Sequence, residues 1–128
     1  MCAPALLRYF SRVMQPFKLE LERLPASTEN LAIYQLKGKL SLETVNEFLP
    51  TSRAEAAKNV VLDMSGVNFL DSAGVGSLVS LFVSRRNQGK TFSLAALGPQ
   101  AQAVVTVAGL QNLLPIYKTV DEAVGKLS

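Results

Sequence analysis

Residues 60–82 read VVLDMSGVNFLDSAGVGSLVSLF, and the rest of the chain is arranged around this stretch. Val60 to Leu62 form an apolar, largely β-branched run that ends in Asp63, and Ser65-Gly66 follows with the chemistry of a turn. These features predict a buried strand from Val60 to Asp63 that leaves a sheet at its carboxyl end, followed by a loop from Gly66 to Asp71.

A helix is predicted directly after this loop. Its apolar residues recur at helical spacing and are Val75, Leu78, Val79 and Phe82. Asp and Ser are both favoured at a helix N-cap, so the helix should begin at Asp71 or Ser72. In sheets with parallel strands, function often lies where a strand passes into the next helix. Ser72 lies at such a junction.

Ser72 is a candidate for modification because of its place in this helix. The first turn has unpaired backbone N–H groups and the positive end of the helix dipole, so a phosphate is favoured there. Gly74 and Gly76 each cost about 0.8–1 kcal/mol relative to Ala in a helix, and close approach of another backbone is a plausible reason for them. The residues off the apolar stripe are small and uncharged: Ala73, Ser77, Ser80 and Ser84. We expect this face to be flat enough to dock a partner.

The run VVLDMSGVNFLDSAGVGSLVSL closely resembles the signature of STAS domains, specifically of bacterial anti-sigma factor antagonists. In that family a strand is followed by a loop ending in Asp-Ser-(Ser/Ala/Thr)-Gly and by a helix whose first Ser or Thr is phosphorylated. The resemblance implies that Ser72 is the phosphoacceptor. It places Ser41 where the family usually has an Asp near the phosphorylation site. With the small helix face, the predicted partner-binding residues are Ser41, Asp71, Ser72, Ala73, Gly74, Gly76, Ser77 and Ser80.

The resemblance also implies a partner-switching mechanism. Unmodified, the loop and the helix face would bind an anti-sigma factor and release its sigma factor. That anti-sigma factor would be a serine kinase of the GHKL type, and a PP2C-type phosphatase would reverse the phosphorylation of Ser72. ATP and magnesium belong to the kinase, so no cofactor is expected in this chain. Two alternatives stay open: a STAS subunit of a membrane transporter complex, and a nucleotide-sensing module, for which Gly74-Val75-Gly76 is half of a phosphate-binding loop.

Composition narrows the function classes. The chain has 128 residues, of which 48% are hydrophobic and 18% charged, which suits one domain with its own core. The net charge is +3 without an aromatic-interleaved basic patch, so no nucleic-acid partner is expected. The single cysteine, Cys2, excludes an intrachain disulfide and favours a reducing, cytoplasmic location. The chain has no His, the commonest metal ligand and general base, which argues against an enzyme and against a metal site. Asp63 and Asp71 are explained by strand-end and cap roles.

Residues 1–16, MCAPALLRYFSRVMQP, are predicted to form an N-terminal arm that precedes the domain at 17–128. The apolar residues of the arm follow helical spacing, with Arg8 and Arg12 between them, and are Leu6, Leu7, Phe10, Val13 and Met14. The arm falls short of the roughly 20 apolar residues of a membrane span and lacks the features of a secretory signal. We expect a short amphipathic helix or loose arm that packs on the domain or on a neighbouring chain, and a homodimer is left open. A membrane-surface anchor is less favoured.

The remaining elements follow from periodicity and turn residues. Strands are predicted at 17–24, at 31–36 and, beside the central strand, at 91–97, with a last edge strand at 113–117. A helix from Leu42 should end or kink at Pro50, followed by a turn or second helix with Ser52 and Glu55 as a capping box. Arg85-Arg86 reads as a solvated helix end.

Two helices complete the pattern. The helix that starts at Gly98-Pro99 should end at Gly109. Its predicted inward residues are Ala103, Val104, Val107 and Ala108. A terminal helix is capped by Thr119 with Glu122. The predicted fold is therefore α/β, a single domain with a mixed sheet of about five strands and four helices in the order β-β-α-β-α-β-α-β-α.

Overall fold

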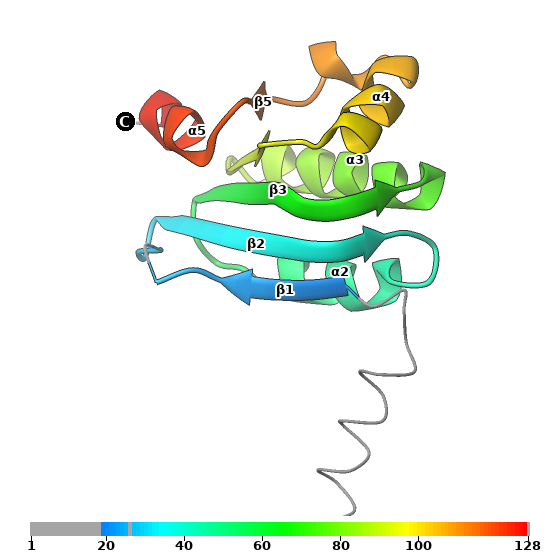
Figure 1. The fold of residues 1–128 in the computed structure, drawn as a ribbon. Helices are drawn as coiled ribbons and strands as arrows, with labels where there is room; N and C mark the ends of the chain where they lie inside the picture. The colour runs from blue at the N-terminus through cyan, green and yellow to red at the C-terminus, as the bar shows by residue number, and fades with distance from the viewer. Residues whose placement is uncertain (1–18, 26, 128) are drawn as a thin grey trace, which may run out of the picture.

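The computed structural model describes residues 19–25 and 27–127, and its five strands form one mixed sheet (Figure 1). The strands are β1 (Leu19–Arg23), β2 (Leu31–Leu40), β3 (Asn59–Leu70), β4 (Thr91–Ala95) and β5 (Ile116–Tyr117). The helices are α2 (Val45–Arg53), α3 (Ser72–Asn87), α4 (Pro99–Val107) and α5 (Val120–Lys126), with a short 3₁₀ helix η1 (Leu110–Asn112). The predicted fold class and element order are confirmed. The arm at 1–16 and the predicted strand residues Phe17 and Lys18 lie outside the described residues.

The strand order is β1-β2-β3-β4-β5, and only the first pair is antiparallel. The remaining pairs are parallel, so the carboxyl ends of β2, β3 and β4 lie at one edge of the sheet. At that edge Leu40 pairs with Leu70, and the chain then continues into Ser41 and Asp71. Two segments that are far apart in the sequence are thus brought together where α3 begins.

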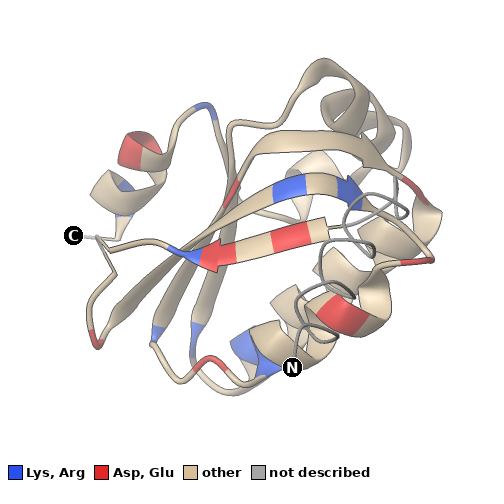
Figure 2. Ribbon diagram, turned by 60° about the horizontal axis from the view of Figure 1, so that its bottom comes forward, with Lys and Arg blue, Asp and Glu red and all other residues tan. Residues whose placement is uncertain are grey.

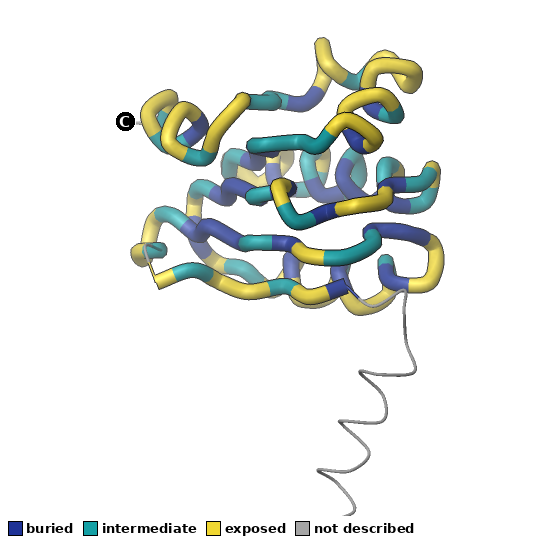
Figure 3. Tube along the Cα trace, in the orientation of Figure 1, coloured by how far each residue is buried: buried dark blue, intermediate teal, exposed yellow. Residues whose placement is uncertain are grey.

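The core has two parts, one on each face of the sheet. The larger cluster lies under α2 and α3 and contains Leu36, Phe48, Leu62 and Leu78. A smaller cluster lies under α5 and is formed by Val61, Ala95 and Ala123. Figure 3 shows burial concentrated on β2 and β3, whereas α4 and α5 carry long exposed stretches. The outer surface of α4 is therefore available for other roles.

The central strand is longer than predicted. β3 passes through Ser65-Gly66 and ends only at Leu70, and β2 likewise continues to Leu40. The register shifts between these strands, and a Cβ on Gly66 would lie 2.7 Å from the Leu36 carbonyl oxygen. The predicted turn is wrong because Gly66 accommodates an irregular but continuous pairing with β2. As a result, the expected loop from Gly66 to Asp71 is strand up to its last residue.

Pro50 does not end the helix, because α2 continues through it to Arg53. A proline inside a helix costs about 3 kcal/mol. Phe48 before it and Ser52 after it are both buried, so packing holds both turns against the core. Leu42, where the helix was predicted to begin, is instead 67% exposed and precedes the helix.

Arg85 is the largest departure from the predicted surface. It is 5% exposed, and its guanidinium donates to the carbonyls of Thr91 (2.8 Å), Ala57 (2.5 Å) and Lys58 (3.1 Å). Burial lowers the pKa of Arg85, and its five donors suit such a cluster of carbonyls. The prediction of a solvated pair holds only for Arg86, which is exposed. Arg85 ties the end of α3 to the starts of β3 and β4.

Glu55 does not form the predicted capping box and instead joins three segments. Its Oε1 accepts from Arg23 Nε (2.9 Å) and from the Tyr34 hydroxyl (2.5 Å), and its Oε2 accepts from the Ala57 N–H (2.9 Å). Desolvation raises the pKa of Glu55, but these hydrogen bonds outweigh it and lower the pKa to about 2. Burial, followed by the contact with Glu55, raises the pKa of Tyr34 to about 12.

We predict that Glu55→Gln lowers the free energy of unfolding by about 1–3 kcal/mol at pH 7, because charged hydrogen bonds are lost. The folded-state pKa of about 2 lies below the ordinary value of 4.5. The stabilisation by Glu55 is therefore complete above pH 4.5 and is lost as the pH falls toward 2. Urea unfolding at pH 7 and at steps below pH 4.5 measures both effects. Equal pH dependence of the wild type and the variant would contradict this role.

Candidate functional site

Ser72 is the first residue of α3 and directly follows Asp71 at the end of β3. The residue is exposed, and no hydrogen bond joins its hydroxyl to another described residue. Asp71 has extended backbone angles and is the N-cap. The prediction that the helix begins at this pair is confirmed, and the serine hydroxyl is presented at the positive end of a 16-residue helix.

The Asp71 carboxylate holds this junction together. Its Oδ1 accepts from the Gly74 N–H (2.8 Å), which caps α3. Its Oδ2 accepts from the Leu42 N–H (3.1 Å) in the segment between β2 and α2. The Asp71 N–H in turn donates to the Leu40 carbonyl (3.3 Å). One side chain thus fixes the start of α3 against the end of β2.

Gly74 allows the same two elements to come this close. A Cβ at this position would lie 2.3 Å from the Leu40 carbonyl oxygen and 2.8 Å from Leu70 Cδ1. The predicted close approach of another backbone is confirmed here. It is wrong for Gly76, which is exposed and whose added Cβ would meet no atom within 4 Å.

A carboxylate lies at the corner where Ser41 replaces the Asp usual in the family. Ser41 is 1% exposed, and its hydroxyl donates to Glu43 Oε2 (2.6 Å). This hydrogen bond is the main cause that lowers the pKa of Glu43, while the charge of Asp71 acts in the opposite direction. Glu43 carries only a weak signal in the sequence, because this acid stands two residues after position 41, where the family has one.

The structure separates the predicted partner-binding residues into three groups. Ser72 and Gly76 are exposed, Asp71, Ala73 and Ser80 are half-buried, and Ser41, Gly74 and Ser77 are buried. Ser77 was expected on the open face, but it is 4% exposed and donates to the Gly74 carbonyl (2.6 Å). Because Gly74 and Ser77 are small, α3 packs close to the sheet on the side that carries them. The buried side of α3 is therefore not the predicted apolar stripe, and of that stripe only Leu78 is fully buried.

An apolar groove of about 390 Å³ opens beside Ser72, between α3 and α4. Its lining residues are Ser72, Val75, Ala103, Val104, Val107 and Ala108. We call it the α3–α4 groove. Val107 is 89% exposed, so this wall of the groove is an open apolar surface.

The α4 residues of the groove were predicted to face the core, and for most of them this is wrong. Ala103, Val107 and Ala108 are exposed, and α4 instead buries Ala101 and Val105. Gln100 fixes this rotation, because its side-chain amide accepts from the Leu70 N–H (2.9 Å) and donates to the Leu70 carbonyl (3.0 Å). The sequence of α4 is apolar on more than one side, so periodicity alone does not choose the inward face.

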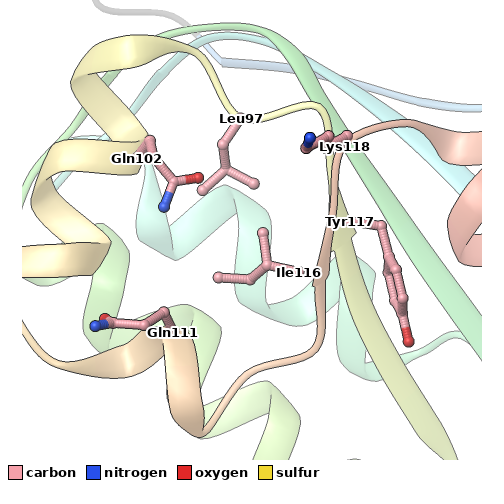
Figure 4. Close-up of a pocket in the computed structure, with 6 residues that line it drawn as sticks. All are labelled: Leu97, Gln102, Gln111, Ile116, Tyr117 and Lys118. Atoms are coloured by element: carbon pink, nitrogen blue, oxygen red, sulfur yellow. The ribbon is translucent and has the colours of Figure 1, made fainter.

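A second hollow of about 350 Å³ lies beyond the carboxyl ends of β4 and β5 (Figure 4). Its lining residues are Leu97, Gln102, Gln111, Ile116, Tyr117 and Lys118. Figure 4 shows the Leu97 and Ile116 side chains in the middle of the hollow, with Tyr117 directed away. Lys118 is the only charged side chain in this lining, and none of the predicted site residues contributes to it.

The other candidate chemistries find little support in the geometry. Gly74 and Gly76 lie within α3 and do not form a phosphate-binding loop. The Asp63 carboxylate accepts from the Ser65 N–H (3.0 Å), within β3. In the part of the chain that the structure describes, no group of three or more His, Cys, Asp or Glu side chains could hold a metal. Figure 2 shows acidic and basic residues interspersed over the elements.

The described residues also contain no helix that is both long and apolar enough to span a membrane.

The chain belongs to the STAS domain family, whose model matches residues 24–123. Its structure resembles an anti-sigma factor antagonist from Mycobacterium paratuberculosis, with 21% identity, a TM-score of 0.77, and coverage of 87% of this chain and 95% of that one. The phosphorylated form of the Bacillus cell fate determinant SpoIIAA matches with 19% identity, a TM-score of 0.64, and coverage of 87% and 100%. A sulfate transporter family protein from Wolinella succinogenes matches with 17% identity, a TM-score of 0.69, and coverage of 79% and 87%. The predicted STAS resemblance is confirmed. At identities this low, the structural likenesses establish a shared fold.

The two glycines of α3 give a matched test of this packing. We predict that Gly74→Ala lowers the free energy of unfolding by about 1–3 kcal/mol, because its Cβ would overlap the Leu40 carbonyl. Gly76→Ala faces open space and should raise the free energy of unfolding by about 0.4–1 kcal/mol. Urea denaturation of both variants measures the difference. A Gly74→Ala protein as stable as the wild type would contradict the close contact of α3 with β2.

Proposed function

We propose that this chain is an anti-sigma factor antagonist that acts in the cytoplasm. In its unmodified form it binds an anti-sigma factor through Ser72, the neighbouring open face of α3 and the α3–α4 groove, and it thereby releases a sigma factor. The observation that carries this proposal is the exposed Ser72 hydroxyl, which makes no hydrogen bond to another described residue and lies at the rim of an apolar groove.

The chemistry of the groove suits a protein partner. None of the described residues that line it is charged, and Val107 is 89% exposed. Covering a valine of this kind contributes about 1.5–3 kcal/mol when its side chain is fully buried. Exposed apolar surface next to a polar rim is typical of protein-binding sites. Ser72 is the polar residue of this lining; Asp71 precedes it in the chain, and the charge of Asp71 interacts with the exposed Glu43.

Phosphorylation of Ser72 would act as a local switch. A phosphate adds about −1.5 to −2 charge, and the helix N-terminus tolerates it without refolding. Asp71 and Glu43 already supply negative charge at this corner, so a partner surface fitted to a neutral hydroxyl would meet strong repulsion. A loss of about 1.4 kcal/mol weakens binding tenfold. We assign the phosphorylation to a GHKL-type anti-sigma kinase, which holds ATP and magnesium, and its reversal to a PP2C-type phosphatase.

The likeness to a sulfate transporter family protein supports a second candidate function. In that case the same surface would bind a subunit of a membrane transporter, without a phosphorylation cycle. The two candidates differ in the partner that they require. Affinity purification of the tagged chain from its own cells therefore separates them.

We predict that incubation with the cognate anti-sigma kinase and ATP adds one phosphate to the wild-type chain and none to Ser72→Ala, as read by intact mass. Calorimetry should show that Ser72→Asp binds the unliganded anti-sigma factor at least tenfold more weakly than the wild type, because charge enters the contact.

Two valine substitutions, one inside the groove and one outside it, test whether the groove contributes to binding. Val107→Glu should weaken binding, whereas Val83→Glu should not, because Val83 is 45% exposed on α3 but does not line the groove. The proposal fails if no candidate kinase modifies the wild-type chain and purification recovers a transporter subunit.

A further inference from the structure

We infer that the N-terminal arm, residues 1–16, docks in the α3–α4 groove of its own domain and covers Ser72. Four properties of the chain point to this occupant: where the arm joins the sheet, how far it reaches, its apolar pattern and its charge. The docking itself does not depend on the proposed function, while its regulatory meaning rests on it.

The arm joins the domain at the edge of the sheet that carries Ser72. β1 begins at Leu19, which pairs with Gly38, and Gly38 pairs in turn with Val67 of β3. The Val67 carbonyl oxygen lies 3.8 Å from an added Cβ on Gly98, the residue before α4. Since strands are about 4.8 Å apart, the arm starts about 15 Å from Gly98 and about 10 Å from β3, which ends two residues before Ser72 of the groove lining.

The arm is long enough to cross this distance. Residues 16–18 span about 10 Å when extended, and residues 6–14 span about 13 Å as a helix. The route passes Leu42, whose side chain is 67% exposed, and then Ser72 at the mouth of the groove. Leu42 is therefore an exposed apolar side chain next to Asp71, before the groove begins at Ser72.

The arm carries the pattern that a groove of this kind binds. An amphipathic helix binds in an apolar groove through anchors at i, i+3 or i+4, and i+7. Leu6, Phe10 and Val13 have this spacing, with Leu7 and Met14 beside them. The described residues that line the groove include no charged side chain that would oppose their burial.

The arm and the corner around Ser72 carry opposite net charge. Residues 1–16 contain Arg8 and Arg12 and no Asp or Glu. The charges of Glu43, Asp71 and Lys39 interact at the corner next to Ser72, which gives it one net negative charge. On a helix anchored by Leu6, Phe10 and Val13 the two arginines lie on the opposite side, so they would attract the arm to this corner without entering the groove. Under the proposed function, the docked arm competes with the anti-sigma factor, so the apparent affinity falls by the fraction of open molecules.

The single cysteine allows a direct test in the full chain without any partner. A nitroxide attached to Cys2 should broaden the amide signals of Val75, Ala103 and Val107 in the ¹⁵N-labelled protein, and reduction of the nitroxide should restore them. Glu20 and Val124, which lie away from the groove, should keep at least several-fold more of their intensity.

Two variants and a mixing control decide the outcome. Phe10→Asp in the arm and Val107→Glu in the groove should each abolish the broadening, and Phe10→Asp leaves the domain sequence intact. The inference is overturned if broadening is absent, is centred away from the groove, or survives both variants. It is also overturned if nitroxide on an unlabelled copy broadens the ¹⁵N copy equally, because the contact is then between molecules. Since no partner is present, neither result bears on the phosphorylation of Ser72.

Discussion

The site depends on one carboxylate. Asp71 accepts from the Gly74 N–H with one oxygen and from the Leu42 N–H with the other. The first bond begins α3, and the second ties α3 to the end of β2. Because both bonds come from the residue next to Ser72, the serine is placed by the same interaction that joins the two strand ends. The Ser72 hydroxyl makes no hydrogen bond to another described residue, so the fold does not require it.

The other contacts turn this joint into a platform. Gly74 removes the side chain that would keep α3 from the Leu40 carbonyl. Arg85 holds the opposite end of α3 through backbone carbonyls before β3 and at the start of β4. Gln100 pairs with both backbone groups of Leu70 and sets the rotation of α4. Together these contacts hold both ends of α3 and the start of α4 against the sheet. An apolar groove lies between the two helices, next to the exposed Ser72.

Local sequence patterns predicted most of the helices and strands. The features that they did not predict depend on contacts between elements that are far apart in the sequence. Asp71-Ser72 predicted the start of α3 because N-cap preference is a property of adjacent residues. The continuation of β3 through Ser65-Gly66 depends on β2, which no local pattern contains. Arg85 reads as a surface residue because most of its carbonyl partners, those of Glu55, Ala57 and Lys58, precede it by 27 to 30 positions.

The groove shows the same limit. The apolar residues of α4 were predicted to be core because the helix pattern does not distinguish its sides. The tertiary structure, in which Gln100 pairs with Leu70 and Val107 is 89% exposed, shows which side of α4 points outward. Likewise, the carboxylate of Glu43 became part of the site through a hydrogen bond from buried Ser41, and the family pattern placed an acid only at position 41.

The decisive question is whether a phosphate on Ser72 acts at the surface without disturbing the fold. A full-length chain carrying phosphoserine at position 72 can be compared with the unmodified chain by backbone amide chemical shifts. We expect changes confined to Asp71, the first turn of α3 and the groove wall of α4, with β3, β4 and α5 unaltered. Shifts that spread through the sheet would show that phosphorylation rearranges the domain, and this would contradict a switch built on local charge.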